Sequence, residues 1–168
     1  MALALPTAER TAVFRAMVSI LRNDPIVSRV CKAIKAWEGK PTDAETLVLG
    51  MAPVIRLTPV GTGDEWMSPA SVVGTLTINV EMLISGYNAD DMGNLWRAII
   101  AAFYAPTGTT FEAVQSQLRA AGAYPPSPMF GTPAFDARPE EQFLFCVAAI
   151  QVKVQTQLSS RGTPAASS

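Results

Sequence analysis

The residues that could do acid–base chemistry are few in this 168-residue sequence, which contains no histidine. Asp90 and Asp91 form a carboxylate pair, but acidic residues are also favoured in the first turn of a helix by its dipole. We therefore interpret this pair as part of a helix start. Glu140 and Glu141 follow a proline and precede an apolar stretch, which is typical of a solvated entry to a strand. The Gly61–Gly63 segment lacks the lysine of a phosphate loop and is interpreted as a turn.

The sequence also offers no candidate nucleophile or metal site. The serines Ser71, Ser116 and Ser127 have no histidine to activate them, and none lies in a G-x-S-x-G turn. Two isolated cysteines cannot supply a zinc site. We expect Cys31 and Cys146 to be buried free thiols, with a disulfide between them as the alternative. The sequence therefore predicts no enzyme activity, no cofactor and no metal ion.

Composition limits the remaining functions. Only 16% of the residues are charged, whereas 49% are hydrophobic, and 13 Lys and Arg face 14 Asp and Glu. This balance disfavours a DNA-reading module, which is usually strongly basic. No apolar run reaches the length of a membrane span, and the N-terminus lacks the basic region of a signal peptide. Chains this apolar often bury further surface against partner subunits.

A helix, an elbow and a second helix are predicted at the start of the chain. Apolar residues recur with helical spacing from Val13 to Leu21. Asp24 then suits the cap of a second helix and Pro25 its first position, so the chain should turn there. The apolar spacing that follows predicts a helix as far as Trp37.

Alternating and helical patterns organise the middle of the chain. Residues 47–60 predict an edge strand or a strand with a break, because their prolines lack a backbone donor. Strict alternation predicts a strand over residues 75–84, and an amphipathic helix should follow, capped by Asn88 or Asp90. Thr109 and Glu112 form a capping box that predicts a further short helix.

The C-terminal third contains an unusual loop and an unusual strand. Residues 123–139 are proline-rich and predict a loop or an extended contact arm. Residues 142–158 alternate like a strand far longer than the common five or six residues, so its excess should pair or pack against something else. Candidate subunit-interface residues are Phe143, Phe145, Ile150, Val152, Val154, Tyr124, Phe130 and Phe135.

This order of elements predicts the α+β class, with an antiparallel sheet and helices packed on one face. The N-terminal helix–elbow–helix and the long C-terminal strand belong to a single domain over residues 1–158, and residues 159–168 read as a flexible tail.

Basic residues concentrate in the N-terminal helices. Seven Lys or Arg face three acidic residues through position 40, whereas the rest of the chain carries a net charge of −5. Arg15, Arg22 and Arg29 fall at seven-residue intervals, although the elbow weakens the inference that they share one face. They form either an ordinary solvated surface or a basic lining that faces a polyanion or an acidic partner ring.

The sequence resembles the tail terminator or tail-completion (head–tail joining) proteins of tailed bacteriophages. The resemblance covers Glu9 to about Gln157 and rests on the order of elements and on local phrases. The phrases are Leu21–Pro25, Ile34–Gly39, Pro53–Pro59, the strand-into-helix run Gly74–Phe103 and the final long strand.

The resemblance implies a protomer that closes into a homo-oligomeric ring, typically hexameric. Such a ring sits on the last ring of the tail tube, stops tube polymerisation and docks onto the head-side connector or neck protein. DNA would pass only non-specifically through its lumen, which Arg15, Arg22 and Arg29 are expected to face. The protein would be found in the neck or tail of the virion after assembly in the bacterial host cytoplasm.

Two alternatives stay open. The first is another neck or head-closure connector protein of similar layout. The second, from a different class, is a module that binds a small apolar ligand or a peptide in a pocket between sheet and helices.

Overall fold

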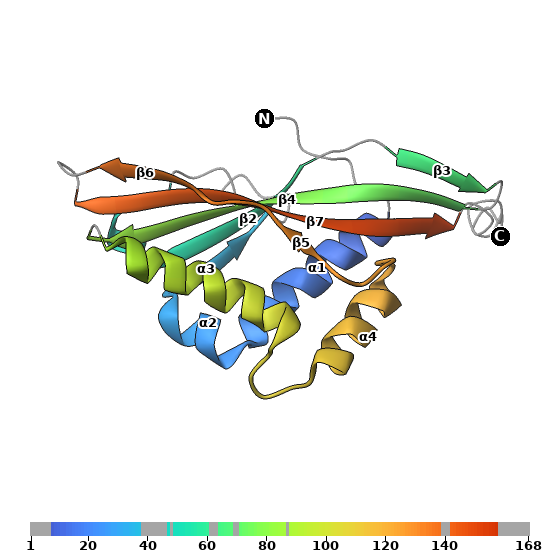
Figure 1. The fold of residues 1–168 in the computed structure, drawn as a ribbon, viewed down its shortest axis with the longest axis horizontal. Coiled ribbons are helices and arrows are strands. Elements are labelled where there is room, and N and C mark those ends of the chain that lie inside the picture. Colours follow the sequence, from blue (N-terminus) through green and yellow to red (C-terminus); the bar gives the residue numbers. More distant parts are fainter. Residues whose placement is uncertain are drawn as a thin grey trace, which may run out of the picture.

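The α-helices of the described residues lie on one side of a single twisted sheet, as Figure 1 shows. This computed structural model describes residues 8–37, 47, 49–60, 64–68, 71–86, 88–138 and 142–157. The predicted α+β class, with a mostly antiparallel sheet and helices on one face, is confirmed. The predictions for Gly61–Gly63, for Glu140 and Glu141, and for the 159–168 tail fall outside the described residues.

The helices are α1 (Ala8–Asn23), α2 (Pro25–Val30), α3 (Ala89–Tyr104) and α4 (Phe111–Ala121), with a 3-10 turn at Leu49–Met51. The strands are β1 (Ala33–Ala36), β2 (Val54–Val60), β3 (Asp64–Ser68), β4 (Ser71–Ser85), β5 (Met129–Phe130), β6 (Ala134–Arg138) and β7 (Phe143–Gln157). No helix among the described residues is long and apolar enough to cross a membrane.

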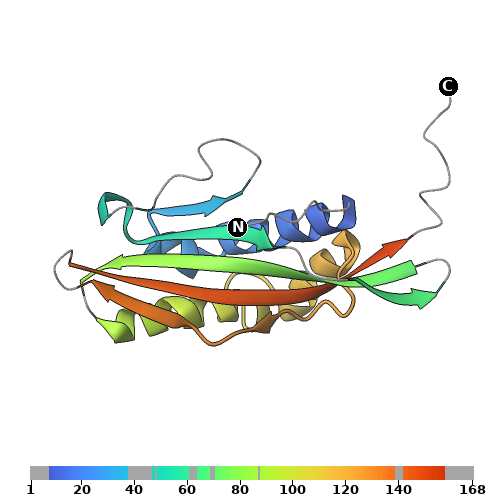
Figure 2. The ribbon, with the colours of Figure 1, turned by 90° about the horizontal axis from the view of Figure 1, so that it is seen from above.

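The sheet has the order β1-β2-β4-β7-β5, with β3 beside β4 and β6 beside β7 (Figure 2). Among the described strands, only β1 and β2 pair in parallel; the other pairs are antiparallel. The long strand β7 is confirmed, but the prediction that part of it would extend beyond its own sheet is wrong. β4 is equally long and pairs with β7 without interruption from Ser71↔Gln157 to Ser85↔Phe143.

The core lies between this sheet and the helices. Alternate residues of β4 and β7 point to the helical side, where Ile78 and Ile150 are completely buried. Ile150, Val152 and Val154 belong to this core and are at most 1% exposed. Their prediction as interface residues is therefore wrong, because the chain's own helices cover the face on which they lie.

The second helix is shorter than predicted. α2 ends at Val30, and residues that were expected to continue it form β1 instead. The helical pattern rests on Ile34 and Trp37, three residues apart, whereas Ile34 and Ala36, two residues apart, share a face only in a strand. Their pairing with Ile55 and Leu57 of β2 decides for the strand. Tertiary pairing here overrides the local helical pattern.

The elbow itself is held by the predicted cap. The buried side chain of Asp24 accepts hydrogen bonds from the backbone N–H groups of Ile26 and Val27, both at 2.9 Å. Replacing it leaves the N–H groups of Ile26 and Val27 without this acceptor, and the bond to Val27 is buried. We expect Asp24→Ala to lower the free energy of unfolding by about 1–2 kcal/mol in urea denaturation.

The matched control for that prediction is Asn88→Ala. Asn88 caps α3 through one bond to the Asp90 N–H at 2.9 Å and is exposed, so its loss should cost less than that of Asp24. Equal losses for the two variants would contradict the role given to burial at the elbow.

β2 is an inner strand rather than the expected edge or broken strand. It lies between β1 and β4, yet it contains Pro59. The backbone N–H of Trp37 donates to the Leu57 carbonyl at 3.0 Å, which places the peptide groups of alternate residues, Leu57 and Pro59, on the β1 side. Because β1 ends at Ala36, opposite Leu57, no β1 residue is paired with Pro59 and its missing N–H is tolerated there.

The segment 123–139 is partly sheet. It supplies β5 and β6, which pair with β7, and Ala123 forms an isolated bridge to Val154. The loop or extended arm expected here thus lies along the sheet edge. The start of α4 also differs by one residue, because Thr110 rather than Thr109 caps it and accepts from the Ala113 N–H at 3.1 Å.

Candidate functional site

The candidate carboxylates and the serine Ser127 have surroundings that are typical of structural residues. Asp90 and Asp91 are exposed in the first turn of α3, as expected for a helix start. The Ser127 hydroxyl accepts a hydrogen bond from the side-chain amide of Gln115 at 3.4 Å. An amide is not a base that could activate this hydroxyl. Within the described ranges, no three acidic, cysteine or histidine side chains gather as metal ligands would.

The two cysteines are buried and free, as predicted. Burial raises the pKa of both Cys31 and Cys146 to about 11. Both side chains are therefore neutral thiols at physiological pH, and neither is an activated nucleophile.

This burial predicts slow thiol chemistry in the folded protein. With a pKa of about 11, about one thiol in a thousand is ionised at pH 8, against about a tenth for a thiol with the unperturbed value of 9.0. We expect Ellman's reagent to react with both cysteines only after denaturation. Because the folded state holds its thiol protons more tightly, these groups should also lower stability as pH rises from about 9 toward 11. Rapid reaction of the native protein at pH 8 would contradict this assignment.

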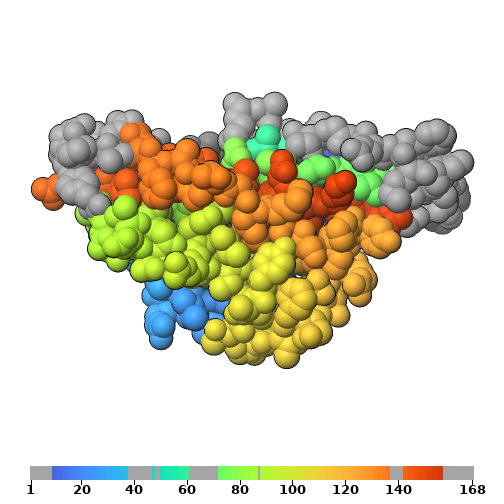
Figure 3. Space-filling view, in the orientation of Figure 1, coloured from blue at the N-terminus to red at the C-terminus, as the bar shows by residue number. Residues whose placement is uncertain are grey.

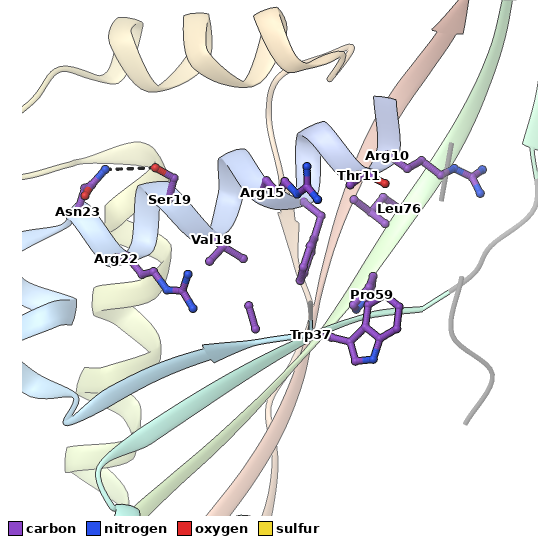
Figure 4. Close-up of a pocket in the computed structure, with 12 residues that line it drawn as sticks. Arg10, Thr11, Arg15, Val18, Ser19, Arg22, Asn23, Trp37, Pro59 and Leu76 are labelled. Carbon is purple, nitrogen blue, oxygen red and sulfur yellow. Dashed lines mark hydrogen bonds between the residues drawn. The ribbon is translucent and has the colours of Figure 1, made fainter. Parts of the chain in front are cut away.

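A basic groove lies between α1 and the strands β1 and β2 (Figure 4). It encloses about 540 Å³, and its floor is apolar, with Phe14, Val18 and Leu76 buried there. Three arginines of α1 line it: Arg10, Arg15 and Arg22. We call this feature the α1 groove; its remaining lining residues are Thr11, Ser19, Asn23, Ala36, Trp37 and Pro59.

The arginines of the α1 groove differ in their surroundings. Arg10 is buried, whereas Arg15 is exposed. Arg22 extends toward β1 (Figure 4). Its Nε and Nη2 atoms donate to the Ile34 carbonyl at 3.3 and 3.0 Å. The groove therefore combines positive charge with an apolar floor, which suits an anionic or acidic amphipathic partner better than a neutral one.

The structure brings together only part of the predicted basic series. Arg15 and Arg22 are two turns apart on α1 and share the groove, but Arg29 lies on α2, beyond the elbow, and is not among the lining residues. Sequence reasoning missed Arg10 and the position of Trp37 at the groove. Arg10 breaks the seven-residue spacing, and Trp37 had been assigned to a helix that the structure replaces with a strand.

The remaining candidate interface residues fall into two places. Phe143 and Phe145 lie half-buried on the helix-free face, packed with Leu83 and Val54. The sheet edge farthest from β1 carries the other three residues, Tyr124, Phe130 and Phe135. Residues 124–138 form a continuous band there over α3 and α4 (Figure 3).

Two members of that edge are open to solvent. Tyr124 is 55% exposed and Phe135 is 52% exposed. Phe130 instead packs against α3, with its ring centroid 5.7 Å from Trp96 and 5.8 Å from Phe103. Tyr104 of α3 donates a hydrogen bond to the Pro128 carbonyl and fixes the edge to the helical layer.

Comparison with known proteins adds no relative: no protein-family model matches the chain, and a search of curated proteins finds no match.

Proposed function

We propose that this protein is a structural subunit of a tailed bacteriophage virion. Copies of it would form a ring that ends the tail tube, joins it to the head-side connector and leaves a channel for DNA. The subunit would assemble in the bacterial host cytoplasm and remain in the neck or tail. The sequence phrases that resemble tail terminator and tail-completion proteins are the starting point for this proposal.

One observation of the fold carries the proposal further: the two sheet edges differ. The β1 edge borders the basic α1 groove, whereas the β5–β6 edge presents the exposed side chains of Met129 and Phe135. A closed ring needs each subunit to offer two different complementary surfaces, and unlike edges meet that need. In such a ring Arg15, Arg22 and Arg29 would face the lumen.

The proposal is tested by light scattering on the eluting protein and by negative-stain images, alone and with assembled tail tubes. A ring-sized particle is expected. A protein that stays monomeric in both conditions would overturn the proposal. Guanidinium groups of Arg15, Arg22 and Arg29 found on the outer rim of a ring would overturn only their lumen role.

The α1 groove favours a second candidate, a module that binds an acidic peptide or an anionic amphipathic ligand. Its volume of about 540 Å³ is within the usual range for ligand sites. This candidate predicts a monomer or dimer whose ligand affinity falls when Arg15 is changed to Ala.

A further inference from the structure

We infer that copies of this chain join head to tail through their sheets, with β6 of one copy pairing antiparallel with β1 of the next. The inference deepens the proposed ring and rests on it, because both require self-association. Among the described strands, β1 ends the sheet on one side, and β5 and β6 lie on the other side of β7 (Figure 2). Both edge strands are short, with four residues in β1 and five in β6.

Strand directions allow this pairing. β1 runs parallel to β2, and β2, β4 and β7 alternate in direction, so β1 and β7 point the same way. β6 is antiparallel to β7 and therefore also to β1. A rotation about an axis along the strands preserves these directions. It would bring β6 of one copy beside β1 of another as an antiparallel pair, with both helical layers on the same side.

The helical side of the two edges is complementary in shape. Phe135 is in register with the buried Cys146, which places Phe135 on the helical face of β6. On β1 the same face carries Ala36, at the α1 groove beside Val18 and Trp37. The exposed ring of Phe135 would therefore enter an apolar surface on the next copy.

The helix-free side is complementary in charge. Asp136 is in register with Phe145, and Lys35 with Arg56, so both charged residues lie on the helix-free face. Pairing would bring the carboxylate of one copy toward the ammonium group of the next. The wider charge distribution agrees: residues 8–37 carry six Lys or Arg against two acidic residues, while seven basic and twelve acidic residues lie elsewhere in the chain.

The edge of β1 is partly protected against other strands. Because the Trp37 N–H points to β2, the alternate residues Ile34 and Ala36 direct their peptide groups outward. Arg22 already occupies the Ile34 carbonyl, and Ala36 is only 8% exposed, so β1 offers few open backbone groups to a new strand. So short an edge gives little binding from the backbone alone, and the side chains of Phe135 and Asp136 would decide the partner.

The test compares Phe135→Ala with Val30→Ala, an exposed apolar residue of α2 that lies in neither edge strand. Assembly is measured by light scattering in solution and by counting rings on tail tubes. Loss of the Phe135 ring should weaken association at least about tenfold, whereas the Val30 variant should assemble like the wild type. Lys35→Glu and Asp136→Lys should each weaken assembly, and the double variant should recover it.

The outcomes separate this interface from the ring itself. Rings that form equally well in every variant would overturn the β1–β6 contact and leave the proposed function standing. A wild-type chain that stays monomeric even on tail tubes would overturn both. Hydrogen exchange gives an independent check: assembly should protect Ala33–Ala36 and Ala134–Arg138 together, and protection of only one segment would contradict the contact.

Discussion

Ile150→Ala should lower the free energy of unfolding by about 2–5 kcal/mol, the cost of truncating a fully buried isoleucine. Ile150 has no exposed surface and lies in the middle of β7, opposite Ile78 of β4 and Phe130 of β5. Its methyl groups fill the layer between sheet and helices, and their loss leaves a cavity that this packed layer closes only in part. Urea denaturation followed by tryptophan fluorescence measures the loss.

The control is Gln151→Ala, one residue further along the same strand. Gln151 lies on the helix-free face, where its amide donates to the Thr77 hydroxyl at 3.4 Å, so its removal should cost less than about 1 kcal/mol. Denaturation midpoints are compared over a range of protein concentrations. A loss for Ile150→Ala that vanishes at high concentration would indicate an interface residue instead and would contradict its place in the core.

Charge reversal in the α1 groove should weaken binding to a polyanion. Arg15 and Arg22 both line this groove, and each arginine that contacts a phosphate contributes about 0.9 to the salt dependence of binding. The double variant Arg15→Glu with Arg22→Glu should therefore reduce the slope of log K against log salt by about 2 per subunit. Binding to a short DNA duplex, measured by fluorescence anisotropy at several salt concentrations, gives this slope.

The matched control is Arg97→Glu with Arg119→Glu, which makes the same charge change on exposed positions of α3 and α4. These helices lie outside the groove, so the control should retain the wild-type slope. An equal reduction in both double variants would show that net charge alone acts, and would contradict a basic surface organised by α1.

The elements with strong periodicity could be predicted from the sequence, because burial on one face requires it. α3 was recognised, with Asn88 as one of two candidate caps, and β7 was recognised over its whole length. The layer architecture followed from their order. The length of β4 was underestimated, since Ser71–Gly74 alternates poorly and is held in the sheet by pairing with β3 and β7. That error produced the expectation of an unpaired excess on β7.

Long-range pairing explains the other differences. Nothing local distinguishes Ala33–Ala36 from the end of a helix, and its strand conformation depends on β2, which is some twenty residues away. The same is true of β5 and β6, which are short strands within a proline-rich segment. The candidate site was found in part: the spacing of Arg15 and Arg22 pointed to a shared basic face. The place of Trp37 in its lining could not be predicted while this residue was assigned to a helix.

The most direct test of the central claim is electron microscopy of the protein mixed with tail tubes assembled from their tube protein. If the protein ends the tail tube as a ring, the images should show a closed ring at one end of each tube, and tubes capped in this way should stop elongating. Tubes that bind no ring and lengthen at the same rate with and without the protein would contradict the account.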